Sequence, residues 1–271
     1  MQETYYRIND PTEQPLEHLV SDGGYCAILR TIGCIGDSLS SGEFESEDEN
    51  GKKMYHDLYD FSWGQFLARD CGCTVYNFSR GGMTAKAYLE SFSHERNFWD
   101  SDKLCRAYIL ALGVNDLNGG QEVGSVGDVD LSDWRNNADT FAGYYAAIVQ
   151  RLREKMPDAR FFFVTIPRTE NGSLFPAHTA LLHELTRMIP HSYVVDLDRD
   201  APAHDEAFRD AFYMGGHMNA AGYRLIAKQI ETYIDWIIRH NMDDFRGIGF
   251  VGTPYGFRKG EMYASSDPRR I

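Results

Sequence analysis

Five short runs of almost uninterrupted apolar residues, each followed by a stretch of helical character, constrain the fold of this chain more than any other feature. Apolar residues on both faces of a strand are typical of a parallel sheet with helices on both sides. The alternation predicts an α/β fold, a three-layer α/β/α sandwich around a doubly wound, mostly parallel five-stranded sheet. Such a sheet binds ligands at the carboxyl ends of its strands. The predicted strands span residues 27–35, 73–79, 106–112, 159–166 and 192–197, and the helical stretches span residues 60–72, 84–92, 131–156, 176–189 and 219–241.

The chain is predicted to form one domain over residues 1–271. Its length and its 43% of hydrophobic residues suffice for one core, and no repeat or low-complexity linker divides it. We expect the core to span about residues 27–240. The tail that follows, residues 241–271, is rich in Gly and aromatic residues and is expected to pack on the domain or at a subunit contact near the ligand cleft. The acidic segment 41–53 lies outside the alternation and predicts a solvated loop.

The charge of the chain narrows its partners. Its 27 Lys and Arg against 40 Asp and Glu give a net charge of -13, which argues against nucleic acid and anionic membrane surfaces as partners. No 18 apolar residues run together, and residues 1–20 lack the basic and apolar regions of a secretory signal, so the sequence predicts a soluble, cytoplasmic protein. The five cysteines are odd in number and lack metal-binding spacing, which predicts buried thiols.

Four blocks of polar residues follow predicted strands. Ser38 comes after the first strand in "GDSL", Gly82 after the second in "NFSRGG", Asn115 after the third in "LGVND", and His217 after the fifth in "GGHMN". Taken singly, each residue is also an ordinary choice for a turn, a cap or a loop. Because the carboxyl ends of parallel strands meet at one edge of a sheet, their recurrence at strand ends predicts one joint site.

Taken in this order, the four blocks resemble the SGNH or GDSL hydrolases, and the resemblance extends from about residue 30 to residue 240. It implies a flavodoxin-like fold in which Ser38 is the nucleophile and His217 is its general base. It also implies an oxyanion hole formed by the backbone N–H of Ser38, by Gly82 and by the side chain of Asn115. The chemistry agrees, because a serine hydroxyl needs an imidazole to remove its proton, glycine permits close backbone approach, and an amide donates without adding charge.

One position departs from the pattern of that family. The last block normally reads Asp-x-x-His, whereas the residue three positions before His217 is Met214. Three acceptors remain open for orienting the imidazole: a main-chain carbonyl of residues 210–216, the side chain of Asp210, and that of Asp205. We favour the carbonyl, because an aspartate outside the motif is more often a solvated surface group, and so predict a Ser-His dyad.

The resemblance also predicts the reaction. It implies a serine esterase that hydrolyses small acyl esters, chiefly acetyl groups on carbohydrates, through an acyl-enzyme intermediate and without a cofactor. The alternatives are a lysophospholipase or acyl-thioesterase of the same family, and a catalytically inactive carbohydrate-binding protein of the same fold. We expect a small-molecule or oligosaccharide ester as partner, no nucleic acid and no membrane; both a monomer and a homo-oligomer stay open. No metal site is predicted, because His178 and His183 are five residues apart and lie on different faces of a helix.

Neighbouring side chains have simpler explanations. Asp37 and Asp116 adjoin site residues, and we expect them to brace the loops by hydrogen bonds. An aromatic group could stack on a sugar ring, but aromatic residues at this spacing belong more often to a core. The group comprises Trp63, Tyr88, Phe92, Phe98 and Trp99.

Overall fold

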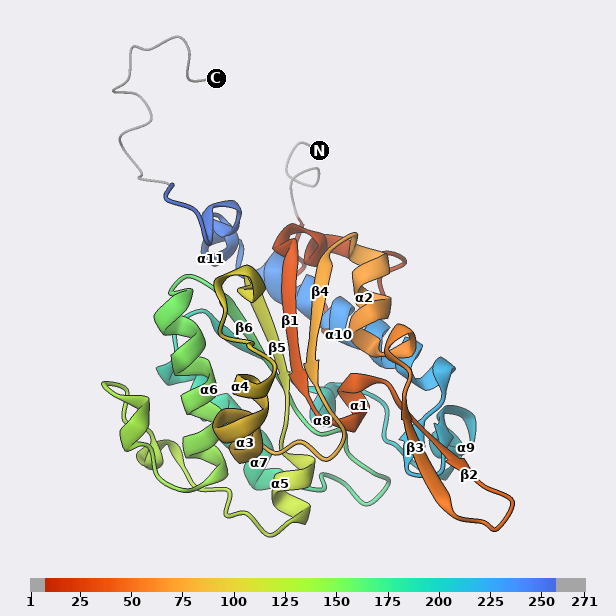
Figure 1. The fold of residues 1–271 in the computed structure, drawn as a ribbon. Helices are drawn as coiled ribbons and strands as arrows, with labels where there is room; N and C mark the ends of the chain where they lie inside the picture. Colours follow the sequence, from red (N-terminus) through yellow and green to blue (C-terminus); the bar gives the residue numbers. More distant parts are fainter. Residues whose placement is uncertain (1–7, 257–271) are drawn as a thin grey trace, which may run out of the picture.

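Five parallel strands form the centre of the computed structural model, which describes residues 8–256 (Figure 1). Their spatial order is β4-β1-β5-β6-β7, and every neighbouring pair is parallel, so the predicted sheet is confirmed. The chain pairs β4 on one side of β1 and β5 on the other, which makes the carboxyl end of β1 the switch point of the sheet. The strands are β1 (Thr31–Gly36), β4 (Thr74–Ser79), β5 (Ala107–Ala111), β6 (Arg160–Val164) and β7 (Ser192–Val195).

Helices cover both faces of this sheet, which confirms the three-layer sandwich (Figure 1). Alternate residues of β5 point to opposite faces: Ile109 packs with the core of α2 and α10, whereas Tyr108 and Leu110 pack with the core of α6. All three are fully buried, which explains why the strand is apolar on both faces. The helices on the first face are α2 (Trp63–Cys71) and α10 (Ala220–His240); those on the second are α3 (Ala85–Ala87), η4 (Tyr88–Phe92), α4 (Ser93–Glu95), α6 (Phe141–Lys155) and α7 (Pro176–Met188).

Short elements connect these layers. They lie in the loops before, between and after the main strands and helices, and several of them carry the polar blocks found in the sequence. They are η2 (Gly24–Leu29), α1 (Ser38–Ser41), η3 (Tyr59–Phe61), η5 (Ser101–Lys103), α5 (Val114–Asn118), η6 (Val126–Asp128), η7 (Trp134–Asn136), α8 (Leu197–Asp200), α9 (Glu206–Phe212), and the strands β8 (Tyr213–Met214) and β9 (His217–Met218).

The sequence of α10 explains both of its ends. At the start, the Asn219 side chain accepts a hydrogen bond from the backbone N–H of Gly222, which satisfies one of the free donors of the first turn. In the last turn, Arg239 lies where its positive charge complements the helix dipole. Among the described residues, no helix combines the length and the apolar character needed to cross a bilayer.

A β-hairpin replaces the solvated loop that we predicted for residues 41–53. Its antiparallel strands, β2 (Glu43–Glu47) and β3 (Lys53–Asp57), project from the edge of the sheet at which the parallel strands end (Figure 1). The prediction was wrong because acidic composition hid two signals. Phe44 alternates with acidic residues and packs against other aromatic rings, and Gly51 adopts a φ of 75° in an Asn-Gly turn, a strong hairpin signal.

The described part of the C-terminal tail packs at the amino-terminal edge of the sheet. It forms α11 (Met242–Phe245) and η8 (Ile248–Phe250). The Val251 carbonyl accepts a hydrogen bond of 3.2 Å from the Arg106 side chain, just before β5. The tail therefore lies away from the strand ends that hold the polar blocks (Figure 1). The expectation that it packs near the ligand cleft was wrong. Its last segment, residues 257–271, lies outside the described residues.

Two groups of side chains from the sequence analysis belong to the core. All five cysteines are free thiols and all are buried, as predicted. The aromatic group of residues 63–99 is also buried, with exposed fractions of 8% or less, so these rings pack in the core and do not form a wall for a sugar. The aromatic residues are Trp63, Tyr88, Phe92, Phe98 and Trp99.

Replacing Phe245 by Ala tests whether the tail is part of the core. The Phe245 ring is buried and stacks on the rings of Phe162 and Tyr193, at 6.4 and 5.6 Å between centroids. We expect Phe245→Ala to lower the free energy of unfolding, measured in denaturant, by about 3 kcal/mol. The exposed Tyr255→Ala is the control and is expected to stay within about 0.5 kcal/mol of wild type. Equal midpoints for both variants would contradict this packing.

Candidate active site

The four residues predicted from the strand ends lie in one cleft. Ser38 follows β1, Gly82 follows β4, Asn115 lies on α5 after β5, and His217 begins β9, just before α10. An open cleft of about 560 Å³ at the carboxyl edge of the sheet is lined by all four, together with residues of the hairpin. It is lined by Ser38, Glu43, Tyr55, Asp57, Arg80, Gly81, Gly82, Asn115 and His217.

Ser38 lies at the first position of α1, in a sharp turn that Asp37 holds in place. The Asp37 carboxylate accepts a hydrogen bond of 3.0 Å from the backbone N–H of Leu39. The backbone N–H of Gly42 donates a hydrogen bond to the Ser38 carbonyl and so closes the turn. Asp37 is almost fully buried, and this burial raises the pKa of its carboxyl to about 7. Asp37 braces the loop, as predicted.

A hydrogen bond connects the Asn115 side chain to the loop that contains Gly82. The Asn115 side-chain amide donates to the Met83 carbonyl at 3.2 Å and lies 3.4 Å from an Asp37 oxygen. Gly82 adopts a φ of 70°, a left-handed conformation that disfavours other residues, and its α-carbon faces open space. Asp116 accepts a hydrogen bond of 2.8 Å from the backbone N–H of Ala85, which fixes this loop to α5. Burial raises the pKa of the Asp116 carboxyl to about 6.

The His217 ring lies between two glutamates of β2. Its Nε2 is 3.0 Å from Glu43 Oε1, and its Nδ1 is 3.5 Å from Glu45 Oε2. The Tyr55 ring from β3 meets the imidazole edge to face, at 5.5 Å between centroids. Burial raises the pKa of Glu43, partly opposed by His217, whereas the ion pair with Lys53 holds the pKa of Glu45 below its ordinary value.

The acids considered from the sequence lie elsewhere. Asp210 is exposed on α9, Asp205 caps the same helix by accepting the Phe208 N–H at 2.8 Å, and Met214 is exposed on β8. Within residues 8–256, both ring nitrogens of His217 face carboxylates of the hairpin, and no carbonyl of residues 210–216 accepts a hydrogen bond from them. Neither glutamate was predicted as a site residue, because the acidic composition of their segment indicated a solvated loop.

Three more residues of the cleft were missed for the same reason or because no motif marks them. Asp57 accepts a hydrogen bond of 2.6 Å from the Ser41 hydroxyl, which ties the hairpin to α1. Tyr55 is 54% exposed and lines the cleft, and Arg80 adds a cation to its lining. The cleft can therefore offer hydrogen-bond donors, acceptors and an aromatic edge to a polar ligand.

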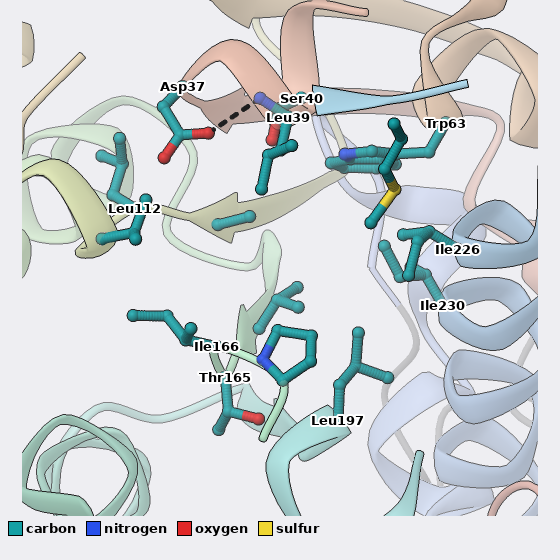
Figure 2. A pocket seen from close by; sticks show the side chains of 15 residues that line it. Asp37, Leu39, Ser40, Trp63, Leu112, Thr165, Ile166, Leu197, Ile226 and Ile230 are labelled. Carbon is teal, nitrogen blue, oxygen red and sulfur yellow. Dashed lines mark hydrogen bonds between the residues drawn. The ribbon is translucent and has the colours of Figure 1, made fainter. Parts of the chain in front are cut away.

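A second, smaller cavity, of about 100 Å³, lies beside the end of β1 and is lined mainly by apolar side chains (Figure 2). Asp37 and Leu39, the neighbours of Ser38, form one side of it, and Ile226 and Ile230 of α10 lie across from Leu112. Ser38 itself lines the open cleft and is not among the residues that line this apolar space. The labelled lining residues in Figure 2 are Asp37, Leu39, Ser40, Trp63, Leu112, Thr165, Ile166, Leu197, Ile226 and Ile230.

The two histidines of α7 have separate structural partners. The buried His178 ring contacts the Leu112 carbonyl at 3.2 Å, and burial lowers its pKa to about 4. His183 pairs with Asp196 at 2.7 Å. In the part of the chain that the structure describes, no group of three or more His, Cys, Asp or Glu residues is placed to hold a metal ion.

Sequence comparison relates the chain to a known enzyme family. A model of the GDSL-like lipase/acylhydrolase family matches residues 34–225, well over half of the chain. No protein with a curated description matches the sequence.

Solved structures share this fold at low sequence identity. A protein from Lactobacillus plantarum has a TM-score of 0.55 and 20% identity, over 76% of this chain and 97% of that one. A family two carbohydrate esterase from Clostridium thermocellum, in complex with cellohexaose, has a TM-score of 0.54 and 16% identity, over 79% of this chain and 65% of that one. A psychrotrophic esterase from a Pseudoalteromonas species has a TM-score of 0.50 and 15% identity, over 77% of this chain and 98% of that one. At these identities the likeness supports the fold.

Burial of Asp37 predicts a specific pH dependence of stability. The folded state keeps the Asp37 proton up to about pH 7, whereas the ordinary pKa is 3.8, so between these values the unfolded chain binds fewer protons and stability falls as pH rises. The neutral Asp37→Asn variant keeps an oxygen for the Leu39 N–H. We expect its free energy of unfolding, relative to wild type, to increase between pH 4.5 and 7.5, measured by denaturant titration.

The exposed Asp60→Asn is the control for this measurement, with a difference from wild type that is constant over the same pH range. The same constant difference for Asp37→Asn would refute the proposed effect of burial.

Proposed function

The chain belongs to the GDSL-like lipase/acylhydrolase family, a family of carboxylic ester hydrolases, and from this premise we propose that it is a serine esterase that removes small acyl groups, chiefly acetyl, from carbohydrates. One observation carries the proposal. Ser38, Gly82, Asn115 and His217, which come from four separate segments, line a single open cleft at the switch point of the sheet.

The four residues act together in the proposed reaction. The Ser38 hydroxyl attacks the ester carbonyl carbon while His217 takes its proton. The oxyanion accepts hydrogen bonds from the backbone N–H of Ser38, from the N–H of Gly82 and from the Asn115 amide. The C–O bond to the alcohol then breaks, and His217 gives its proton to the departing oxygen. Water, activated in the same way, releases the acid from Ser38.

The lining of the cleft supports a polar leaving group such as a sugar. Arg80, Asp57 and Glu43 offer donors and acceptors to hydroxyl groups, and the exposed Tyr55 ring offers a surface on which a sugar can pack. The similarity in fold to a carbohydrate esterase that was solved with cellohexaose agrees with this class of substrate.

A second candidate is hydrolysis of esters or thioesters with longer acyl chains, as by a lysophospholipase or an acyl-thioesterase. The small apolar cavity favours it, because that space is lined by Leu39 and Met218, which follow the proposed nucleophile and base in the sequence. The acyl chain length that the protein prefers separates the two candidates.

The test is hydrolysis of 4-nitrophenyl acetate, butyrate and octanoate, with Ser38→Ala as control. We expect turnover that falls steeply beyond butyrate and is lost in Ser38→Ala, by a factor of at least about 10³. Faster turnover of octanoate than of acetate would favour the second candidate. If folded wild-type protein neither hydrolyses an ester nor reacts with a fluorophosphonate, the proposal fails, and a protein that only binds carbohydrate remains.

Removing the Asn115 amide tests the oxyanion hole. We expect Asn115→Ala to lower kcat by a factor on the order of 10² to 10³ with little change in KM, because the lost hydrogen bond forms only in the transition state. The control is Asn118→Ala, which alters the exposed end of the same short helix and does not line the cleft. Equal kcat values for both variants would remove Asn115 from the hole.

A further inference from the structure

We propose that Glu45, supplied by the β2–β3 hairpin, is the positioning residue that orients His217 in place of the aspartate that this chain lacks. The inference rests on the proposed function, because it assigns a partner to the proposed general base. It replaces the main-chain carbonyl that the sequence favoured, and it turns the Ser-His dyad into a triad whose acid comes from near the nucleophile.

The Nδ1 nitrogen of the His217 ring faces Glu45. His217 Nδ1 is buried and has no hydrogen bond of good geometry, yet it lies 3.5 Å from Glu45 Oε2. The Glu45 side chain is only 6% exposed. A buried imidazole nitrogen that faces a buried carboxylate this closely needs only a small movement to donate its proton, and that bond selects the tautomer whose Nε2 can accept a proton from Ser38.

Glu45 is held as an ionised acceptor. It forms an ion pair with Lys53 across the hairpin, and it accepts a hydrogen bond of 2.9 Å from the backbone N–H of Gly216. A carboxylate fixed by a cation and a backbone donor stays charged and keeps its place, which is what stabilising an imidazolium requires.

A pair of glycines directly precedes His217. Gly215 has a φ of 69°, and a β-carbon there would overlap the Glu45 carboxylate; one at Gly216 would lie 3.2 Å from Glu45 Oε2. A side chain at Gly215 would displace the Glu45 carboxylate and would be strained at this φ, so glycine at this position lets the loop and the carboxylate lie this close. Where the family pattern has an aspartate, Met214 is exposed, and the glycines admit an acid from the hairpin instead.

Glu43, the other glutamate beside the ring, is on the wrong side to orient it. It contacts Nε2, the nitrogen that must take the Ser38 proton. Its carboxylate also packs against Gly81, where a β-carbon would overlap it, so it lies on the substrate side of the imidazole. Glu43 therefore competes with Ser38 for Nε2 in the free protein, whereas Glu45 is free to act on Nδ1 throughout.

Other charged and titratable groups face the ring and enter any pH profile. The hairpin contributes Tyr55, Asp57 and Lys53 in addition to the two glutamates, and the loop after β4 contributes Arg80. The test variant must therefore remove the negative charge of Glu45, which faces Nδ1. Its control must remove one negative charge elsewhere on the hairpin.

The test compares Glu45→Gln with the matched control Glu47→Gln, because Glu47 is exposed on the same strand and does not line the cleft. With 4-nitrophenyl acetate, we expect Glu45→Gln to lower kcat by a factor on the order of 10² to 10⁴, with KM within about twofold of wild type. The acidic limb of kcat/KM should move to lower pH, because the imidazolium loses its carboxylate. Glu45→Asp should restore part of kcat, and Glu47→Gln should match wild type.

Lys53→Gln keeps the test decisive if Glu45→Gln does not fold. Lys53 is 54% exposed, so its replacement leaves the core intact. The replacement removes the cation that forms an ion pair with the Glu45 carboxylate. The acidic limb should then move to higher pH, opposite to the shift of Glu45→Gln. An unmoved limb in Lys53→Gln overturns the inference.

The outcomes separate the two proposals. If wild type hydrolyses the ester and a fluorophosphonate labels Ser38, but Glu45→Gln stays within about threefold in kcat with the same acidic limb, the inference fails and the esterase stands. If wild type neither turns over nor is labelled, both fail.

Discussion

The pairing of β1 with β4 on one side and β5 on the other is the constraint on which the candidate site depends. In both pairs the register places Gly36 level with the ends of its neighbours, opposite Ser79 and Ala111. The three loops that follow therefore start at the same height on one edge of the sheet. Ser38, Gly82 and Asn115 come together because the backbone hydrogen bonds of the sheet set this register, whereas their own side chains contribute only local bracing.

The sequence was informative wherever burial fixed the residue type. Strands such as β6 are apolar on both faces because Phe161 and Phe162 point into opposite cores, so their existence, order and neighbouring helices were predictable. The four blocks were predictable because they follow such strands. The resemblance to a family then assigned them roles that composition and periodicity alone do not give.

The hairpin was not predictable in the same way because exposed polar strands carry little hydrophobic signal. Glu43 and Glu45 differ from surface glutamates only in what they face, and that is decided by the packing of β2 against the loop before α10. The Asn-Gly turn indicated a hairpin, and the two glycines before His217 indicated a close approach, but neither names the approaching group. The position of the tail was also beyond reach, because it depends on which edge of the sheet leaves apolar surface uncovered.

Negative charge gathers in this site, although the proposed reaction itself creates an oxyanion beside Ser38. Acidic side chains repel a developing oxyanion. The surroundings of Asp37 and of Glu45 reduce this repulsion, because they keep the two acids in different charge states. Burial raises the pKa of Asp37 to about 7, so at neutral pH this brace is protonated part of the time and then repels an oxyanion less. Lys53 and the Gly216 N–H lower the pKa of Glu45, which stays charged on the far side of the imidazole. An acid that is neutral part of the time near the proposed oxyanion, and an ionised acid behind the proposed base, both favour acyl transfer through Ser38 and His217.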